Sequence, residues 1–309
     1  MAIAFTFPGQ GSQSVGMGKA LADAFPEARR VFEEVDEALG EKLSQVIWEG
    51  PEDRLTLTAN AQPALMAVSL AAVRALEARG FSIKDKVAHV AGHSLGEYSA
   101  LCAAGMFSVA DTARLLRLRG NAMQAAVPVG EGAMAAILGL DQQGVEDACR
   151  GGGCQIGQDN GAGPLAICGA KAAVEEAARL CTEKGAKRAL MLQVSAPFHS
   201  ALMAPAADAM RDALAKVARN APVVPVVSNV VVAPLSDPDE IAQRLVEQVT
   251  GRVRWRETVE WFAANGVTTL YEIGAGKVLS GLAKRIAREG ATVTAAAAAD
   301  VDAALPALG

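Results

Sequence analysis

Short apolar runs of strand length alternate along the chain with longer stretches in which apolar residues recur at helical spacing. The apolar and β-branched runs predict strands over 3–7, 87–91, 223–227 and 268–273. The helical patterns, several opened by proline or closed by glycine, predict helices over 26–40, 63–80, 95–104, 108–124, 202–219, 240–249, 255–265 and 277–288. Such alternation is typical of an α/β fold whose mostly parallel sheet is covered by helices on both faces.

The pattern changes between residues 127 and 195. Here the predicted order is strand, helix, strand, strand, helix, strand, over 133–138, 141–150, 155–158, 165–168, 171–184 and 188–194. This is the order of the ferredoxin-like split motif. We therefore expect a small domain at 127–195, inserted into a large domain that is built from 1–126 and 196–309.

The stretch Gly92-His93-Ser94-Leu95-Gly96 joins the strand at 87–91 to the helix at 95–104. A G-x-S-x-G sequence between a strand and a helix is the nucleophile elbow, in which a strained turn lifts the serine hydroxyl above the sheet. The two glycines relieve crowding in that turn. Ser94 is therefore a candidate nucleophile, and the alternative is a glycine-rich turn that carries a serine by chance.

Three histidines are candidates for the base that a serine nucleophile needs. His93 adjoins Ser94 across a sharp turn, so the two side chains should point apart, and His89 lies on the strand below the turn. His199 lies in a loop ahead of a helix, late in the chain, where elbow enzymes place their base. The sequence thus favours a Ser94–His199 pair. No acidic residue stands out as a third member, and a backbone carbonyl can hold an imidazole instead.

Arg119 falls on the apolar side of the helix predicted over 108–124. At about 100° per residue its neighbours on that stripe are leucine, alanine and methionine, whereas Arg114 and Arg117 project away from it. A buried guanidinium needs an anion because an unpaired buried charge is very costly. That anion is either an internal carboxylate, in a structural ion pair, or the carboxylate of a substrate.

Glycines also follow the first strand, in Pro8-Gly9-Gln10-Gly11-Ser12-Gln13. A dinucleotide-binding fingerprint starting at Gly9 would need glycine where Ser14 stands, and a phosphate loop ending at Lys19 would need glycine at Gln13. Both nucleotide-binding motifs are therefore excluded. What remains is a loop with exposed backbone N–H groups, and such a loop can supply one oxyanion donor to an elbow enzyme.

Composition and charge narrow the class of protein. The formal net charge of −5 argues against nucleic acid as the main partner. Five cysteines with scattered spacing fit reduced thiols, and they form no zinc-binding set with the histidines. The first five residues contain no basic leader segment, and no apolar run approaches membrane-spanning length. We expect a cytoplasmic protein with neither a metal nor a membrane partner.

Several motifs occur in an order that matches one family. They are Gly9-Gln10-Gly11-Ser12-Gln13, Gly92-His93-Ser94-Leu95-Gly96-Glu97-Tyr98-Ser99-Ala100-Leu101, Arg119-Gly120, Pro197-Phe198-His199 and Gly274-Ala275-Gly276-Lys277-Val278-Leu279. Through nearly its whole length the chain resembles the malonyl-CoA:acyl carrier protein transacylases of type II fatty-acid synthesis. The resemblance implies a hydrolase-like large domain with a mostly parallel sheet and an inserted ferredoxin-like small domain.

The resemblance also implies a catalytic site. Ser94 would carry a malonyl ester, His199 would act as its general base, and Arg119 would hold the malonyl carboxylate. The backbone N–H groups of Gln10 and Leu95 would bind the oxyanion. The implied substrates are malonyl-CoA and the phosphopantetheine thiol of acyl carrier protein, and no cofactor is implied because CoA enters as part of a substrate.

Three further positions follow from the resemblance. Gln248 is the counterpart of the glutamine through which the family's histidine is oriented. Asn160 matches a position in the family's cleft, although an asparagine in a glycine-rich turn is usually a turn former. Phe198, before the histidine, stands where many members have serine, so the chain departs from the family pattern at the acyl pocket.

Acyl carrier proteins are strongly acidic in this family, so a net-negative chain would need a local basic patch to bind one. Lys277, Lys284 and Arg288 align on one edge of the helix predicted over 277–288, opposite its apolar face. Lys187 and Arg188, at the start of a strand, would extend this patch. The alternative is an ordinary solvated helix face.

Other classes of protein share parts of this pattern. A serine esterase or thioesterase would use water as the acceptor, but an enzyme for neutral acyl chains would have leucine rather than arginine at position 119. A carrier-protein-binding module without catalysis would need no nucleophile, base or oxyanion donors. An acyltransferase that serves a polyketide assembly line would carry the same motifs.

Overall fold

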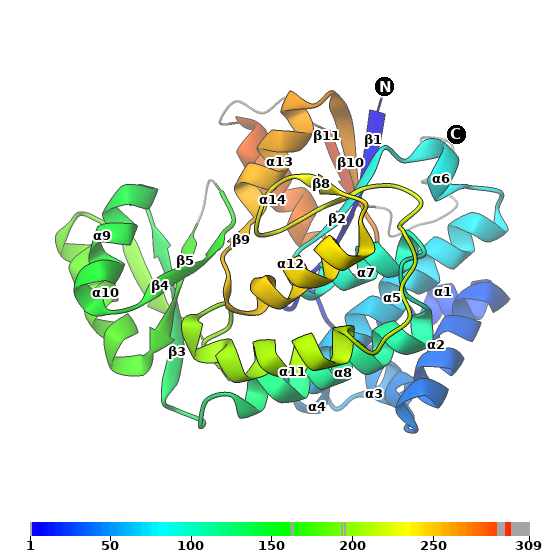
Figure 1. Ribbon diagram of the computed structural model, residues 1–309, viewed down its shortest axis with the longest axis horizontal. Coiled ribbons are helices and arrows are strands. Elements are labelled where there is room, and N and C mark those ends of the chain that lie inside the picture. Colours follow the sequence, from blue (N-terminus) through cyan, green and yellow to red (C-terminus); the bar gives the residue numbers. More distant parts are fainter. Residues whose placement is uncertain (1, 162–163, 193, 195, 289–293, 298–309) are drawn as a thin grey trace.

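The computed structural model describes residues 2–161, 164–192, 194, 196–288 and 294–297. It contains two sheets, each flanked by helices (Figure 1). The α/β fold that the alternating pattern predicted is confirmed. Within the described residues no helix combines the length and the apolar character needed to cross a bilayer.

The larger sheet has the strand order β11-β10-β1-β2-β7-β8. Its strands are β1 (Ala2–Phe7), β2 (His89–Gly92), β7 (Val226–Val227), β8 (Pro234–Leu235), β10 (Val267–Glu272) and β11 (Thr294–Ala297). All neighbours run parallel except β7 and β8. The predicted strands are all present, although 223–227 is reduced to two residues. The pattern did not predict β8, which is only two residues long, or β11, which is rich in alanine.

Helices cover both faces of this sheet. The helices of this part of the chain are α1 (Lys19–Ala24), α2 (Pro26–Leu39), α3 (Leu43–Glu49), α4 (Glu52–Thr56), α5 (Thr58–Ala78), α6 (Ile83–Lys86), α7 (Leu95–Ala103), α8 (Val109–Ala125), α11 (Ala204–Leu214), α12 (Pro238–Thr250), α13 (Trp255–Ala264) and α14 (Val278–Arg288). Phe5 of β1 belongs to the core shared with α2, α5, α7 and α8, whereas its neighbour Ala4 belongs to the core shared with α13 and α14. This alternation is what a strand buried on both faces requires.

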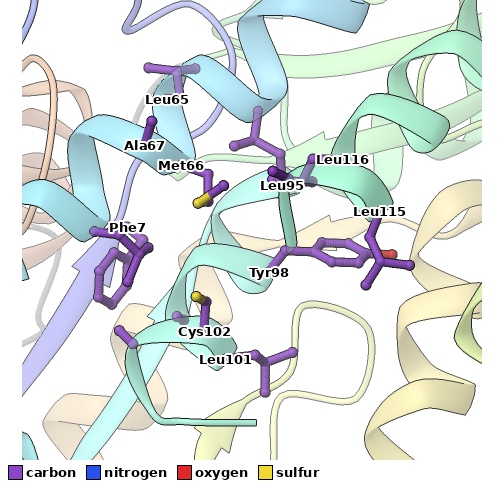
Figure 2. Close-up of a cluster of buried hydrophobic side chains, with 14 of the residues drawn as sticks. Phe7, Leu65, Met66, Ala67, Leu95, Tyr98, Leu101, Cys102, Leu115 and Leu116 are labelled. Atoms are coloured by element: carbon purple, nitrogen blue, oxygen red, sulfur yellow. The ribbon is translucent and has the colours of Figure 1, made fainter. Parts of the chain in front are cut away.

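Helix α7 lies at the centre of the large core, and all nine of its residues are buried. Figure 2 shows its side chains Leu95, Tyr98 and Leu101 among residues of α5 and α8. A helix that is apolar on most of its circumference needs such surroundings. The start of α7 is therefore fixed from all sides, which gives the elbow a rigid support.

Two helices differ from their predicted bounds. The helix predicted over 202–219 is a 3-10 turn (Ala201–Met203) followed by α11, and Pro205 stands in the first turn of α11, where a missing N–H costs nothing. Helix α5 begins at Thr58 and contains Pro63, instead of starting near it. The cap predicted for α8 is present, because the Ser108 hydroxyl accepts a hydrogen bond from the Asp111 N–H at 3.0 Å.

The smaller sheet has the strand order β6-β3-β5-β4-β9. Its elements are β3 (Gly132–Leu138), α9 (Gln142–Gly152), β4 (Gln155–Asp159), β5 (Leu165–Ala170), α10 (Lys171–Glu183) and β6 (Arg188–Met191), which keep the predicted order. The strand β9 (Val253–Arg254) runs parallel to β4 at the sheet edge. Because β9 comes from the stretch expected in the large domain, the two parts of the molecule share a sheet edge.

Candidate active site

Ser94 stands between β2 and α7 with φ 55° and ψ −112°, a strained conformation for a residue with a side chain. The flanking glycines leave no room for a side chain. A Cβ on Gly92 would lie 1.9 Å from the backbone of Gly96, and a Cβ on Gly96 would lie 2.2 Å from the carbonyl oxygen of Phe7. The local geometry is therefore that of the predicted elbow.

Two buried amides hold the elbow in place. Asn229, which follows β7, accepts a hydrogen bond from the Ser94 N–H at 2.9 Å and donates one to the Gly92 carbonyl at 2.7 Å. Gln248, in the last turn of α12, donates to the Ser94 carbonyl at 3.0 Å. The sequence reasoning missed Asn229. Its one local signal is a polar residue directly after a buried strand.

Ser94 and His199 lie within hydrogen-bonding distance. Ser94 Oγ is 2.8 Å from His199 Nε2, and His199 Nδ1 is 2.8 Å from the backbone carbonyl of Gln248. Because a carbonyl only accepts, Nδ1 carries the ring proton and Nε2 is free to accept the serine proton. The ring is thus oriented by a backbone carbonyl, the arrangement expected in the absence of an acidic third residue.

The histidine is held as a neutral base. His199 is 1% exposed, and burial together with the nearby Arg119 charge lowers its pKa to about 3. An imidazole with that pKa is unprotonated at neutral pH. Its ring nitrogen can therefore take a proton without first losing one.

Arg119 lies in the core beside the nucleophile. Its Nη1 donates to Gln62 Oε1 at 2.8 Å, and its Nη2 donates to Gln248 Oε1 at 2.9 Å and to Ser94 Oγ at 3.1 Å. The guanidinium is 1% exposed. Among the described residues no carboxylate oxygen lies within 4 Å of it, so the structural ion pair that the sequence left open does not form there.

Glu97 is a second buried charge that the sequence reasoning did not single out. Its carboxylate accepts hydrogen bonds from Gln248 Nε2 at 2.7 Å and from the Asn229 N–H at 3.3 Å. Burial raises its pKa to about 7. The Gln248 amide therefore lies between Glu97, which can only accept when ionised, and Arg119, which can only donate, and this fixes which way the amide faces.

Ser94, His199 and Arg119 line one small cavity of about 40 Å³. Its other lining residues are Gln10, Gln62, His93, Leu95, Met123, Gln158 and Phe198. Among the sequence-predicted residues, Gln10 reaches the cavity from the loop after β1, and Leu95 from the first turn of α7. In the described part of the chain no group of three or more His, Cys, Asp or Glu side chains is placed to hold a metal ion.

Comparison with known proteins identifies the family. The model of the acyl transferase domain family matches residues 4–303. The malonyl CoA-acyl carrier protein transacylase of Escherichia coli strain K12 is 48% identical over 287 residues, which cover 92% of each protein. The crystal structure of the acyl-carrier-protein S-malonyltransferase from Bartonella henselae is 61% identical and superposes with a TM-score of 0.97 over the full length of both chains. The chain belongs to the malonyl-CoA:acyl carrier protein transacylase family. It is an acyltransferase.

A further relative in this family was solved with a partner. The structure of a malonyl-transacylase in complex with its type II polyketide-synthase acyl carrier protein is 43% identical to the chain. It superposes with a TM-score of 0.94 and covers 100% of this chain and 99% of that one. The similarity therefore includes both sheets.

Asn160 and His93 lie beside the family's cleft in this chain. His93 Nε2 is 2.8 Å from Asn160 Oδ1, and the His93 ring packs 5.7 Å from that of Trp255. The His93 ring is thus engaged on the side away from the Ser94 hydroxyl. His89 packs edge-on against Trp261 on the far face of the sheet, so His199 is the histidine brought to the nucleophile.

The residues predicted to bind the carrier protein fall on two elements. Lys277 precedes α14 and Lys284 lies within it, and both are exposed. The opposite face of α14 is buried through Leu279, Leu282 and Ile286. Lys187 and Arg188 are exposed at the start of β6. Arg288 is the last residue of α14, and its side chain lies outside the described part of the structure.

Proposed function

We propose that the protein transfers the malonyl group from malonyl-CoA to the phosphopantetheine thiol of acyl carrier protein through a malonyl ester on Ser94. The observation that carries the proposal is the position of Arg119. This buried cation touches the nucleophile oxygen at 3.1 Å, is surrounded by neutral amides and has no carboxylate partner within 4 Å among the described residues. A substrate carboxylate would supply the missing anion.

In the first half-reaction, His199 Nε2 takes the Ser94 hydroxyl proton while Oγ attacks the thioester carbon. The carbon–sulfur bond then breaks, and the protonated His199 gives its proton to the departing CoA thiolate. Malonyl remains on Ser94 as an ester. Arg119 holds the distal carboxylate, and this contact fixes the thioester carbon close to Oγ.

The oxyanion of each tetrahedral intermediate would be bound by the backbone N–H groups of Gln10 and Leu95. In the described part of the chain neither N–H has a protein acceptor. Leu95 also begins α7, so the positive end of the helix dipole faces the developing charge. Two donors and a helix terminus at the nucleophile support this assignment.

In the second half-reaction the carrier-protein thiol gives its proton to His199 and attacks the ester carbon. The carbon–oxygen bond breaks, and Ser94 Oγ recovers the proton. The names of the relatives and the solved transacylase–carrier complex support acyl carrier protein as the acceptor. We place its docking surface on Lys277, Lys284 and Arg288, extended by Lys187 and Arg188, and we infer that Asn160 borders the path of the thiol.

The reaction requires no metal or prosthetic group, because the nucleophile, base and oxyanion donors are all supplied by the chain. We further infer that the larger sheet is the core of a hydrolase-like domain and that β3 to β6 form a ferredoxin-like one. In that assignment the domains comprise 1–126 with 196–309, and 127–195.

Intact-mass measurement tests the proposal. Incubation with malonyl-CoA alone should add one malonyl group to Ser94, and the later addition of holo acyl carrier protein should remove it and malonylate the carrier. Ser94→Ala should form no adduct, His199→Ala should form it orders of magnitude more slowly, and the exposed control Ser236→Ala should behave as wild type. An adduct on another residue would contradict the mechanism, and rapid loss of the ester to water would indicate a thioesterase.

A further inference from the structure

A glutamine of the small sheet contacts the loop that carries the base. Gln155 begins β4, and its Nε2 donates to the carbonyl oxygens of His199 and Thr250, at 3.2 Å each. Its Oε1 accepts the N–H of Ala201 at 2.9 Å. Both ends of one amide are thus engaged, and all three partners are backbone groups of the part of the chain after residue 196.

The contacted loop needs support. His199 has φ 59°, a left-handed conformation that costs a residue with a side chain about 1–3 kcal/mol and persists only where neighbours enforce it. Gln155 bonds to the carbonyl of His199 itself and to the N–H two residues later. It therefore holds the backbone on both sides of the peptide that follows the strained residue.

The second contact of Gln155 reaches the group that orients the imidazole. His199 Nδ1 is bonded to the carbonyl of Gln248, and Thr250 lies two residues further along the same last turn of α12. One amide therefore links the backbone of the base to the helix end that fixes its ring. The separation between His199 Nε2 and Ser94 Oγ depends on the relative placement of these two segments.

The rest of the small sheet is fitted closely to this loop. A Cβ on Gly157, two residues along β4, would lie 3.3 Å from the His199 Cβ and 3.1 Å from the Phe198 carbonyl oxygen. Cys168 of β5 places its Sγ 3.4 Å from the His199 carbonyl oxygen. Movement of this sheet would therefore be transmitted directly to the base.

We propose that Gln155 is a positioning residue that holds His199 in register with Ser94, so that the small sheet sets the geometry of proton transfer. The inference rests on the proposed role of His199 as general base. Gln155 touches neither the nucleophile nor Arg119 in the structure. Its loss should therefore slow both half-reactions, in which His199 moves the proton, and leave binding of the malonyl group nearly unchanged.

Gln155→Met, which keeps the length of the side chain and removes its hydrogen bonds, tests the proposal. Rapid-quench measurements would follow malonyl-Ser94 formation and its transfer to carrier protein at saturating substrate. We expect both rate constants to fall by about 10- to 100-fold, the size of effect known for small misplacements of catalytic groups, with the KM for malonyl-CoA within about threefold of wild type. The exposed Gln143→Met, which loses only a contact to Asp147, should keep wild-type rates.

A second variant guards against a general loss of structure. Gln155→Glu keeps the acceptor for the Ala201 N–H but presents oxygen to two carbonyl groups, so it should also be slow at temperatures well below its unfolding transition. Wild-type rates in either folded variant, or a higher KM with unchanged rates, would overturn the proposal. If the wild-type protein forms no adduct on Ser94, the proposed function itself fails, and the inference about Gln155 falls with it.

Discussion

Arg119 Nη2 donates a hydrogen bond to Ser94 Oγ over 3.1 Å, so the buried cation and the nucleophile are in direct contact. This contact joins two tasks in one small cavity. The cation can hold the far end of a dicarboxylic acyl group close to the atom that attacks it, and its charge also lowers the pKa of His199. Substrate choice and base strength are therefore coupled through a single side chain.

The first prediction concerns acyl selectivity. Arg119→Ala should reduce kcat/KM for malonyl transfer by about 2–4 kcal/mol in transition-state free energy, since it removes a buried charge-assisted contact. Acetyl transfer should fall less or even improve, because acetyl has no carboxylate. Arg119→Lys should restore little, since a single ammonium does not reproduce the guanidinium fork.

Parallel assays with malonyl-CoA and acetyl-CoA measure the selectivity. Arg114→Ala, an exposed arginine on the same helix that pairs with Asp111, is the matched control and should leave both activities unchanged. Equal losses with both substrates, together with a lower unfolding temperature, would show that Arg119 serves the core and not the substrate.

The second prediction is a pH profile. Burial and Arg119 hold the pKa of His199 at about 3, so malonyl-Ser94 formation should stay nearly constant from pH 8 down to pH 5.5. An ordinary histidine with a pKa of about 6.5 would have lost about tenfold by then. In Arg119→Ala, assayed with acetyl-CoA, the acid limb should move to higher pH because a positive neighbour is gone. A wild-type limb near pH 6.5 would contradict this account.

The third prediction concerns stability and pH. Glu97 has a pKa of about 7 in the folded protein against 4.5 for the ordinary group, so folding favours its protonated form. Its contribution is fully present below pH 4.5 and is lost as pH rises through 7, by up to about 3 kcal/mol. His199, whose pKa is lowered, has the opposite sign, since its contribution is lost as pH falls from 6.5 towards 3.

Urea unfolding of wild type and Glu97→Gln at pH 5 and pH 8 separates these effects. Both proteins contain His199, so its titration cancels in the difference. The variant should gain stability relative to wild type as pH rises, because glutamine has no proton to lose. A difference that does not change with pH would mean that Glu97 titrates as an exposed carboxyl does.

Local patterns identified the parts of the site that lie close together in sequence. The elbow at Ser94 and the core-facing Arg119 each follow from a few neighbouring residues, and the alternation of strands and helices gave most of the two sheets. Gln248 came only from the family resemblance. Asn229, Gln62, Glu97 and Gln155 were not predicted, because their partners are 19 to 154 residues away and nothing in the local sequence separates a buried amide from a solvated one.

The fourth prediction tests the steric basis of the elbow. Gly92→Ala should destabilise the protein by about 3 kcal/mol or more and slow adduct formation on Ser94, because its Cβ would overlap the backbone of Gly96 at 1.9 Å. Gly281→Ala, in α14, has open space around the added methyl group and should raise stability by about 0.5–1 kcal/mol. Thermal and urea unfolding of the pair give both values, and a Gly92→Ala protein with wild-type stability and rate would refute the close-packed elbow.

The last prediction concerns the carrier protein. The chain is itself negative, so an acidic partner must be attracted by a local field, and exposed lysines on α14 and β6 provide one beside a buried apolar face. Reversing two charges in Lys284→Glu/Arg288→Glu should raise the KM for carrier protein, most strongly at low salt, where screening is weakest. Malonylation of Ser94 by malonyl-CoA should barely change, because that step needs no partner. Lys84→Glu/Lys86→Glu makes the same change of charge on α6, at a separate place in the fold (Figure 1), and should have little effect. If both double variants show the same carrier-protein kinetics at every salt concentration, the docking surface lies away from α14.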